Sequence, residues 1–308
     1  MDISRGKIRK ILVYGANGVQ GRAIARELRS QAFDVRAAVR DTARATALEQ
    51  ADIQLVSADL ENPDSLRRAS AGRDAVVLTV PLEFRREVVL RWVTAVANAA
   101  RAEDVKLLVL NSTRLSPEPT ELPMFELRRD VEALVRRLGP PSIVLRSPIY
   151  LENLESPPMA ASIAREGVVA YPLAARLRVS WMSVADLGAY VGAALRRPDL
   201  VGASFDIGGP QVLDGPALAR ELAHVAGKPV SYVAIPPEMI EKQLTAGLGS
   251  SVAQSIARSY AWLALHAETT LLSGTSAELA RDLRRPPISA AAWARTQAWA
   301  AEARAHSA

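Results

Sequence analysis

The 308-residue chain has no cysteine, which excludes disulfide bonds, thiol nucleophiles and metal sites built on cysteine. Its three histidines, His224, His266 and His306, are scattered, and we predict no metal site. No apolar run approaches the roughly 18 residues that span a bilayer, and the polar residues 1–10 do not suggest a signal peptide. We therefore expect a cytoplasmic protein without a membrane partner.

Lysine is also scarce, because five lysines stand beside 33 arginines in a chain of net charge +5. A basic chain raises the question of nucleic-acid binding. The arginines are spread along the whole chain, however, and no basic block is interleaved with aromatic residues. Solvated helix faces explain the arginine pairs, which fall in different predicted helices or at their ends: Arg85-Arg86, Arg128-Arg129, Arg136-Arg137, Arg196-Arg197 and Arg284-Arg285. We predict no nucleic-acid partner.

What the chain does have is a strand, a glycine-rich turn and a helix near its beginning. The apolar segment 11–14 runs into Gly15, Gly18 and Gly21, spaced G-x-x-G-x-x-G, and an amphipathic segment follows. In dinucleotide-binding folds the first glycine allows the sharp turn, the second admits the pyrophosphate, and the third lets the helix approach the sheet. The helix N-terminus then faces the phosphates. The pattern indicates nucleotide binding, and an ordinary tight strand-to-helix turn is the alternative.

The end of the second predicted strand, 34–40, bears on which nucleotide binds. NAD-binding proteins usually have an acidic residue here for the ribose 2′-hydroxyl, whereas arginine offers a fork of donors to a 2′-phosphate. The residue is Arg40; Asp41 follows in a predicted turn, and Arg44 would add a second positive charge. We predict NADP(H) as the preferred cofactor. NAD(H) remains the alternative if Arg40 is only a solvated strand end.

The first half of the chain alternates short apolar segments with helical ones, which is typical of a doubly wound parallel α/β sheet of the Rossmann type. We predict strands at 11–14, 34–40, 53–58, 75–80, 106–111 and 142–145, with later helices at 43–50, 63–70, 83–102 and 124–138. Ligands of such sheets bind beyond the carboxyl ends of the strands. The glycine loop and these strand ends supply the candidate cofactor-binding residues: Gly15, Asn17, Gly18, Val19, Gln20, Gly21, Arg40, Asp59, Leu60, Thr79, Val80, Pro81, Asn111 and Pro148.

Beyond residue 150 the pattern loosens and becomes richer in proline and glycine. We predict helices at 159–166, from 184 onward, and at 216–226, 237–247, 252–264, 277–283 and 289–304, with strands at 178–182 and, followed by a turn, within 205–210. The expected organisation is a Rossmann domain over residues 1–150 and a smaller, mostly helical substrate lobe over residues 151–308. We expect this lobe to pack on the first domain and to be partly interleaved with it.

Over nearly its whole length the chain resembles the NmrA-like group of atypical short-chain dehydrogenases/reductases. The similarity rests on the order and spacing of several motifs: GANGVQG at 15–21, Val39-Arg40, Ala58-Asp59-Leu60, the segment 145–153, Val184–Leu187, Gly208–Pro210 and the segment 285–289. The resemblance implies an NADP(H)-binding Rossmann domain with a cleft against a small C-terminal lobe. The group includes reductases of quinones, dyes and isoflavonoid-type compounds, and also regulators that sense nicotinamide nucleotides.

One departure from the related pattern bears on mechanism. Carbonyl-reducing relatives carry a tyrosine and a lysine four residues apart on the helix after the fifth strand, where the lysine lowers the tyrosine pKa. Here these positions hold Met124 and Arg128. Arg128 can hydrogen-bond a ribose but does not shuttle protons near neutral pH; a solvent-facing arginine is the alternative. We therefore expect hydride transfer to a quinone, enone or cationic dye, in which the added electrons delocalise, rather than ketone reduction.

The predicted function is that of an NADPH-dependent reductase of a small conjugated or aromatic acceptor. Ser112 and Thr113 near the fifth strand end, Arg128, and Tyr150 after the sixth strand are the candidate catalytic residues, and Asn153 is a further pocket candidate. Strand-end or capping roles remain open for them. Two other functions stay open: a non-catalytic NAD(P)-sensing protein, and an isomerase or dehydratase that retains its cofactor. The helices at 83–102 and 124–138 are compatible with a homodimer, although no residue demands one.

Overall fold

The computed structural model describes residues 7–305, which form two compact units. The first unit contains the chain up to Ser147 together with 184–207 and 276–285. The second contains 148–183, 208–275 and the chain from Pro286 onward. The chain thus returns to the first unit twice after Ser147.

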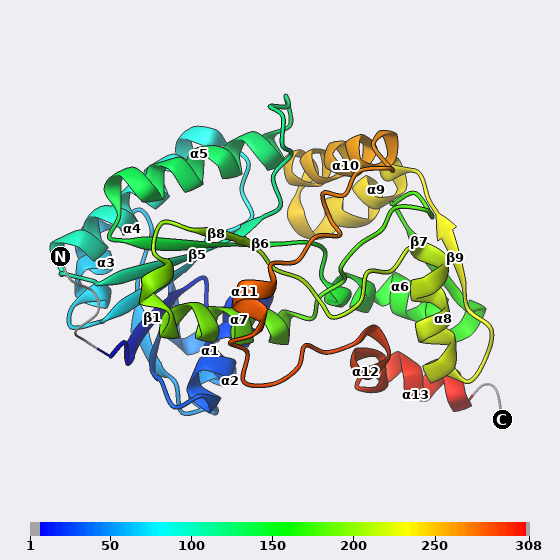
Figure 1. Cartoon of the computed structure of the whole chain (residues 1–308), viewed down its shortest axis with the longest axis horizontal. Helices are drawn as coiled ribbons and strands as arrows, with labels where there is room; N and C mark the ends of the chain where they lie inside the picture. The colour runs from blue at the N-terminus through cyan, green and yellow to red at the C-terminus, as the bar shows by residue number, and fades with distance from the viewer. Residues whose placement is uncertain (1–6, 306–308) are drawn as a thin grey trace. The chain divides into compact units, whose positions relative to one another are not determined.

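A seven-stranded sheet forms the centre of the first unit, with the strand order β3-β2-β1-β4-β5-β6-β8 (Figure 1). The strands are β1 Lys10–Tyr14, β2 Asp34–Val39, β3 Gln54–Ser57, β4 Ala75–Thr79, β5 Leu107–Thr113, β6 Ser142–Ser147 and β8 Ser204–Asp206. Every neighbouring pair is parallel. The strand order reverses between β1 and β4, which is the switch point where ligands of such sheets bind. The predicted doubly wound parallel sheet is confirmed.

Helices cover both faces of this sheet. They are α1 Val19–Ser30, α2 Thr46–Glu49, α3 Pro63–Ser70, α4 Arg86–Ala102, α5 Pro123–Leu138, α7 Val184–Arg196 and α11 Ala277–Ala280, with the 3₁₀ turns η2 Thr42–Arg44 and η5 Pro198–Leu200. Helices α3, α4 and α5 lie on one face, and α1 and α7 lie side by side on the other (Figure 1). No helix among residues 7–305 is both long and apolar enough to cross a membrane.

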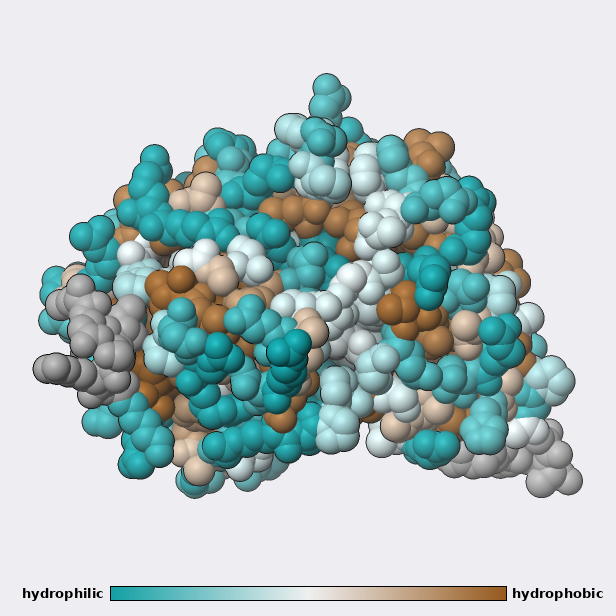
Figure 2. All heavy atoms as spheres, viewed as in Figure 1, coloured by the Kyte–Doolittle hydropathy of each residue, from teal (hydrophilic) through white to brown (hydrophobic). Residues whose placement is uncertain are grey.

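The amphipathic pattern of these helices explains how they pack. Helix α4 buries Val89, Val93 and Val96 on one face, at the spacing of successive helical turns. They join a core cluster with sheet residues such as Leu12 and Leu110. Hydrophilic side chains predominate on the outer surface of α5 in the space-filling view, where Figure 1 places that helix (Figure 2).

Two helices of the first unit depart from their predicted bounds because side chains form turns ahead of them. The helix predicted at 43–50 is instead η2 followed by α2, and the Asp41 carboxylate accepts a hydrogen bond from the Ala43 amide at 3.0 Å. The helix predicted at 83–102 begins only at Arg86. There the Glu83 carboxylate accepts hydrogen bonds from the amides of Phe84 and Arg85, each at 2.9 Å.

The second unit contains a two-stranded parallel sheet, β7 Val168–Tyr171 and β9 Ser231–Ala234. Its helices are α6 Pro157–Ala161, α8 Gly215–Ala226, α9 Pro237–Leu248, α10 Ser250–Leu265, α12 Ala290–Arg295 and α13 Ala298–Ala305, with a 3₁₀ turn η3 Leu151–Glu155 and a π turn η4 Ser162–Glu166. Buried aromatic residues contribute to its core, among them Tyr171, Trp181, Trp293 and Trp299.

Several predictions for this half of the chain were wrong in detail. The strand predicted at 178–182 forms only isolated bridges, Val179 with Leu213 and Met182 with Tyr150. The helix predicted at 159–166 changes to a π turn before Gly167, whose φ is 67°. The helix predicted at 289–304 is divided into α12 and α13, and that at 277–283 ends at Ala280. The strands β7 and β9 were not predicted.

Candidate functional site

The glycine loop joins β1 to α1 at the switch point of the sheet. Gly15 has a φ of 72°, and a Cβ added to it would lie 2.8 Å from the Thr79 carbonyl oxygen at the end of β4. A Cβ on Gly21 would lie 2.2 Å from the Gly15 carbonyl oxygen. The first position therefore needs glycine for the turn, and the second needs it for the approach of the helix. These structural roles are confirmed, whereas contact with a cofactor stays a prediction.

Gly18 differs from the other two glycines of the loop. Its φ is −78°, and an added Cβ would meet only the Gly15 carbonyl oxygen, at 3.4 Å. The backbone conformation and the packing of the protein therefore tolerate a side chain here. The residue is exposed, so its lack of a side chain leaves room outside the loop.

The beginning of α1 favours an anion. Within the described chain no side chain caps this helix end, and its first turn has no acidic residue. Free amides at a helix N-terminus, together with the helix dipole, attract negative charge. The Arg22 guanidinium donates to the Asn17 carbonyl oxygen at 3.0 Å and braces the loop. Val19 is 63% exposed beside it.

A hydrogen-bond network ties the start of α1 to three strand ends. The Asn111 side-chain amide on β5 donates to Gln20 Oε1 at 2.7 Å and to Thr79 Oγ1 at 3.4 Å. The Ser147 hydroxyl at the end of β6 donates to Asn111 Oδ1 at 3.4 Å. Gln20, Thr79 and Asn111 were predicted separately as cofactor-binding residues, and the structure brings them together. Ser147 completes the network, a role that the sequence did not predict.

At the end of β2, Arg40 is exposed and forms no ion pair or side-chain hydrogen bond with any residue from 7 to 305. The carboxylate of Asp41 accepts the hydrogen bond that forms η2. The carboxylate of Asp59, at the end of β3, accepts one from the Glu61 amide at 3.0 Å. Both acids thus serve local turns, while the Arg40 guanidinium stays available. The side chain of Arg44 lies outside the described part of the structure.

The extension of β5 beyond its predicted end places Ser112 and Thr113 in the sheet. Ser112 is buried, and its hydroxyl donates to the Glu132 carboxylate at 3.0 Å, while the Thr113 hydroxyl donates to the Ser147 carbonyl oxygen at 3.4 Å. The Arg146 guanidinium binds Glu132 with two nitrogens, at 2.9 and 2.6 Å. This hydrogen bonding raises the pKa of Arg146. Ser112 therefore directs its proton to Glu132, and its role toward an acceptor stays a prediction.

Glu132 is a functional candidate that was not predicted from the sequence. It lies on α5, is 1% exposed, and links that helix to β5 and β6. The available signal was a single acid within the apolar segment 131–135, which is otherwise the buried face of the helix. A buried carboxylate requires a charged partner, and Arg146 supplies it.

One helical turn before Glu132, Arg128 occupies the position of the lysine in the missing dyad. It is partly exposed, and burial lowers its pKa to about 10. No carboxylate within residues 7–305 pairs with it. Met124, at the tyrosine position, offers only a weakly accepting thioether. Arg128 is thus a desolvated cation without an acidic partner near the carboxyl end of β5.

The remaining predicted residues divide between the units. Leu60, Val80 and Pro81 follow strand ends of the first unit. Pro148 and Tyr150 belong to the second unit, where Tyr150 directly precedes η3 and bridges to Met182.

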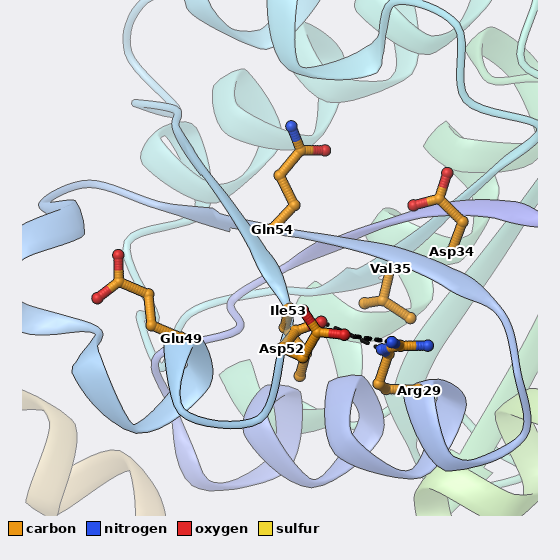
Figure 3. A pocket seen from close by; sticks show the side chains of 7 residues that line it. All are labelled: Arg29, Asp34, Val35, Glu49, Asp52, Ile53 and Gln54. Carbon is orange, nitrogen blue, oxygen red and sulfur yellow. Dashed lines mark hydrogen bonds and ion pairs between the residues drawn. The ribbon is translucent and has the colours of Figure 1, made fainter.

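A cavity of about 450 Å³ lies at the opposite, amino edge of the sheet (Figure 3). It is lined by Arg29, Asp34, Val35, Glu49, Asp52, Ile53 and Gln54. The Arg29 guanidinium binds the Asp52 carboxylate, as the dashed lines show (Figure 3). No predicted site residue lines this cavity, and its one lining cation is already paired.

A family model described as the NmrA-like family matches residues 7–293. An NAD(P)H azoreductase of Xenophilus azovorans is 29% identical over 252 residues, 82% of this chain and 86% of that protein. A solved NADPH-dependent quinone oxidoreductase of Escherichia coli, complexed with NADPH, has a TM-score of 0.76 at 23% identity, covering 92% and 98% of the two chains. NmrA, a negative transcriptional regulator solved with NADP, has a TM-score of 0.74 at 18% identity, covering 97% and 98%. These structural likenesses show the fold.

Proposed function

Because the chain belongs to the NmrA-like family, we propose that it is an NADPH-dependent reductase of a small conjugated or aromatic acceptor. The observation that carries the proposal is a combination of three features at the carboxyl edge of the sheet. The backbone of the glycine loop packs closely between Gly15 and Gly21, no side chain within the described residues caps the N-terminus of α1, and Arg40 lacks an acidic partner among residues 7–305. All three features favour a bound phosphate-bearing nucleotide.

The residues at this edge fit a dinucleotide. The backbone near Gly18 and the start of α1 would bind the pyrophosphate, and the Arg40 guanidinium would bind a 2′-phosphate through its planar fork. Thr79, Asn111 and Gln20 fix the loop against the strand ends through their hydrogen bonds. Arg128 would donate to the nicotinamide ribose. When bound, the cofactor supplies the hydride, and the protein supplies position and exclusion of water.

Helix α5 lacks a side chain that could protonate a reduced ketone, and this bears on the class of acceptor. Met124 cannot protonate an alkoxide, and a guanidinium does not release its proton near neutral pH. An acceptor that delocalises the added charge, such as a quinone, an enone or a dye, needs no such donor at the reacting carbon. The names of the azoreductase and the quinone oxidoreductase that this chain resembles support that class.

A second candidate function is a protein that senses the nicotinamide nucleotide without turnover. The same two residues, Met124 and Arg128, favour it, because they keep a binding cation while removing the proton donor. The likeness to NmrA, a negative transcriptional regulator, adds support. A sensor must bind the oxidised and reduced cofactors with different affinities, because a ligand without preference shifts no equilibrium.

The decisive experiment is a titration with NADPH, NADP⁺, NADH and NAD⁺, followed by tryptophan fluorescence. We expect NADPH to bind at least about tenfold more tightly than NADH, a difference of about 1.4 kcal/mol, and Arg40→Ala to abolish this preference. The second arm measures NADPH oxidation with quinones, enones, azo dyes and triphenylmethane dyes.

Three results would contradict the reductase proposal. A clear preference for the oxidised cofactor, without oxidation of NADPH by any acceptor, would favour the sensor. A cofactor that stays bound while a substrate is converted without net consumption would indicate an isomerase or dehydratase. If none of the four nucleotides binds, the interpretation of the glycine loop is wrong.

A further inference from the structure

In the second unit, the side chains of three residues form a row of hydrogen bonds that is separate from the proposed cofactor-binding residues. Asn153 on η3 donates from Nδ2 to the Tyr171 hydroxyl at 2.9 Å. Tyr171, at the end of β7, shares a hydrogen bond of 2.6 Å with the hydroxyl of Tyr260 on α10. Asn153 is exposed, Tyr171 is 3% exposed, and Tyr260 is partly exposed. The row of hydrogen bonds therefore leads from Asn153 at the surface through the buried hydroxyl of Tyr171 to the hydroxyl of Tyr260.

The side-chain amide of Asn153 determines which hydroxyl donates in each of these hydrogen bonds. Because Asn153 Nδ2 can only donate, the Tyr171 hydroxyl accepts its hydrogen bond. Within residues 7–305 the Tyr260 oxygen is the one acceptor for the hydroxyl hydrogen of the buried Tyr171, so Tyr171 donates to Tyr260. The hydroxyl hydrogen of Tyr260 then has no hydrogen-bond acceptor among residues 7–305. A donor that receives a hydrogen bond from another donor is polarised and donates more strongly.

The ring packing holds this donor in place. Tyr171 contacts Trp181 edge-to-face, with ring centroids 5.3 Å apart, and contacts Tyr260 in the same way at 5.7 Å. Burial raises the pKa of both phenols, and the raised values keep them protonated near neutral pH. The neighbouring Tyr232 differs, because its hydroxyl donates to the Leu173 carbonyl oxygen at 2.9 Å. Of these three tyrosines, Tyr260 is the one whose hydroxyl hydrogen has no acceptor among residues 7–305.

We propose that the Tyr260 hydroxyl donates a hydrogen bond to the lone pair of an uncharged aromatic ligand, such as a quinone oxygen or an azo nitrogen. Tyr260 is then a ligand-binding residue, and Tyr171 and Asn153 are positioning residues. The ligand is taken to be the acceptor, so this inference rests on the proposed function.

The hydrogen bond from Tyr260 should affect the reduction of a quinone and of a triphenylmethane dye differently. A quinone that gains a hydride becomes a hydroquinone anion, whose oxygen carries the new charge until it takes a proton from water. A donor at that oxygen therefore stabilises the product-like transition state. A triphenylmethane cation that gains a hydride becomes a neutral leuco dye and takes up no proton. Tyr260 should matter for the first acceptor and not for the second.

The test measures binding of 1,4-naphthoquinone by quenching of tryptophan fluorescence, because Trp181 contacts Tyr171. Tyr260→Phe keeps the ring and removes the donor, and we expect it to raise the Kd for the quinone about fivefold. Tyr232→Phe is the matched control: it removes a hydroxyl that the protein itself uses, so its Kd should equal that of the wild type.

Asn153→Asp tests the direction of these hydrogen bonds without removing a hydroxyl. A carboxylate only accepts, so Tyr171 would donate to residue 153, Tyr260 would donate to Tyr171, and no hydrogen would be left for the ligand. We expect this variant to raise the Kd about as much as Tyr260→Phe. Ser156→Asp adds the same charge three residues away, at an exposed position, and should leave the Kd unchanged.

Turnover separates this inference from the proposed function. With NADPH, Tyr260→Phe should lower kcat/KM about fivefold or more for the quinone and leave it unchanged for crystal violet, a triphenylmethane cation. Equal losses for both acceptors, or wild-type quinone affinity in both Tyr260→Phe and Asn153→Asp, would overturn the inference. If the wild type binds the quinone but oxidises no NADPH, the proposed function fails, while the binding arms still decide the role of Tyr260.

Discussion

The two edges of the seven-stranded sheet use their charges differently. At the amino edge, Asp74 accepts hydrogen bonds from the Lys106 ammonium at 2.8 Å and from the backbone amides that begin β1. The Arg29–Asp52 pair at the same edge lines the cavity of Figure 3. At the carboxyl edge, Arg40 and Arg128 have no acidic partner within residues 7–305.

We therefore base the proposed site on the cations without a partner and not on the cavity. A concave surface whose ions already bind one another offers little to a charged ligand. A desolvated cation without a partner, such as Arg128, costs stability, and proteins keep such costs mainly at functional sites. If the carboxyl edge serves the nucleotide and the amino edge serves the fold, substitutions at the two edges should change different properties.

The largest effect is expected at Gly21. Gly21→Ala would place a Cβ 2.2 Å from the Gly15 carbonyl oxygen, and backbone atoms cannot give way cheaply. We expect a loss of about 3 kcal/mol in the free energy of unfolding, together with loss of NADPH binding. Urea denaturation and fluorescence titration measure the two effects.

Gly247 on α9 is the matched control, since a Cβ there meets nothing within 4 Å. Gly247→Ala should gain about 0.5 kcal/mol, because alanine favours a helix over glycine. If both alanine variants behave alike, the close approach of Gly15 and Gly21 has no energetic role.

The next effect concerns the cofactor preference. Arg40→Asp replaces the phosphate-binding fork by an acceptor for a ribose hydroxyl. We expect the Kd for NADPH to rise about a hundredfold, or about 2.8 kcal/mol, while the Kd for NADH stays the same or falls. Arg29→Ala, at the amino edge, should leave both values unchanged. An equal effect of the two variants on NADPH would show that general positive charge, not the strand end, attracts the nucleotide.

The sequence sufficed for the sheet of the first unit but not for the details of the second. Apolar runs such as 75–80 and 106–111 are long enough to mark buried parallel strands, and the glycine spacing marks the loop between β1 and α1. By contrast, β7 and β9 have only four residues each, and β9 is mostly exposed. Strand β3 is equally short, but it was predicted because it falls within the alternation of strands and helices in the first half of the chain. No such alternation surrounds β7 and β9.

The candidate site was predictable wherever strand order alone placed a residue. Gln20, Thr79 and Asn111 follow from the rule that parallel strands end at one edge. The contact between Ser112 and Glu132 did not follow, because it depends on the rotation of α5 about its axis and on two further residues of β5 pairing with β6. The link from Asn153 through Tyr171 to Tyr260 joins segments up to about a hundred residues apart, and no local pattern marks it.

A smaller effect, dependent on pH, is expected at the amino edge. Burial tends to raise the pKa of Asp74, but the hydrogen bonds from Lys106, Lys10 and Arg9 outweigh it and lower the pKa below its ordinary value. A carboxylate with a lowered pKa stabilises the fold above its ordinary pKa, and this contribution is lost as the pH falls through the lowered value.

Asp74→Asn should therefore lower the free energy of unfolding by about 1–2 kcal/mol at pH 7. The difference from the wild type should begin to shrink below about pH 4, the ordinary pKa of the unfolded carboxyl group, and should vanish as the pH falls through the lowered pKa of folded Asp74. NADPH affinity should not change. A pH-independent difference in urea denaturation would show that the carboxylate charge is not what stabilises this edge, and a loss of NADPH affinity would break the comparison between the edges.

The smallest effect is expected at Arg128, and its two parts have opposite signs. Burial lowers the pKa of this guanidinium to about 10, so we expect its charge to be less favourable in the folded protein than in water. Arg128→Met removes the charge and keeps much of the apolar volume, so the protein without nucleotide should gain about 1 kcal/mol in stability.

If Arg128 donates to the bound nucleotide, the same variant should raise the Kd for NADPH about threefold to fivefold. Arg128→Lys restores the charge and should recover most of that affinity. A variant that gains stability without losing affinity would make Arg128 a desolvated surface residue, and only Arg40 would then distinguish the carboxyl edge.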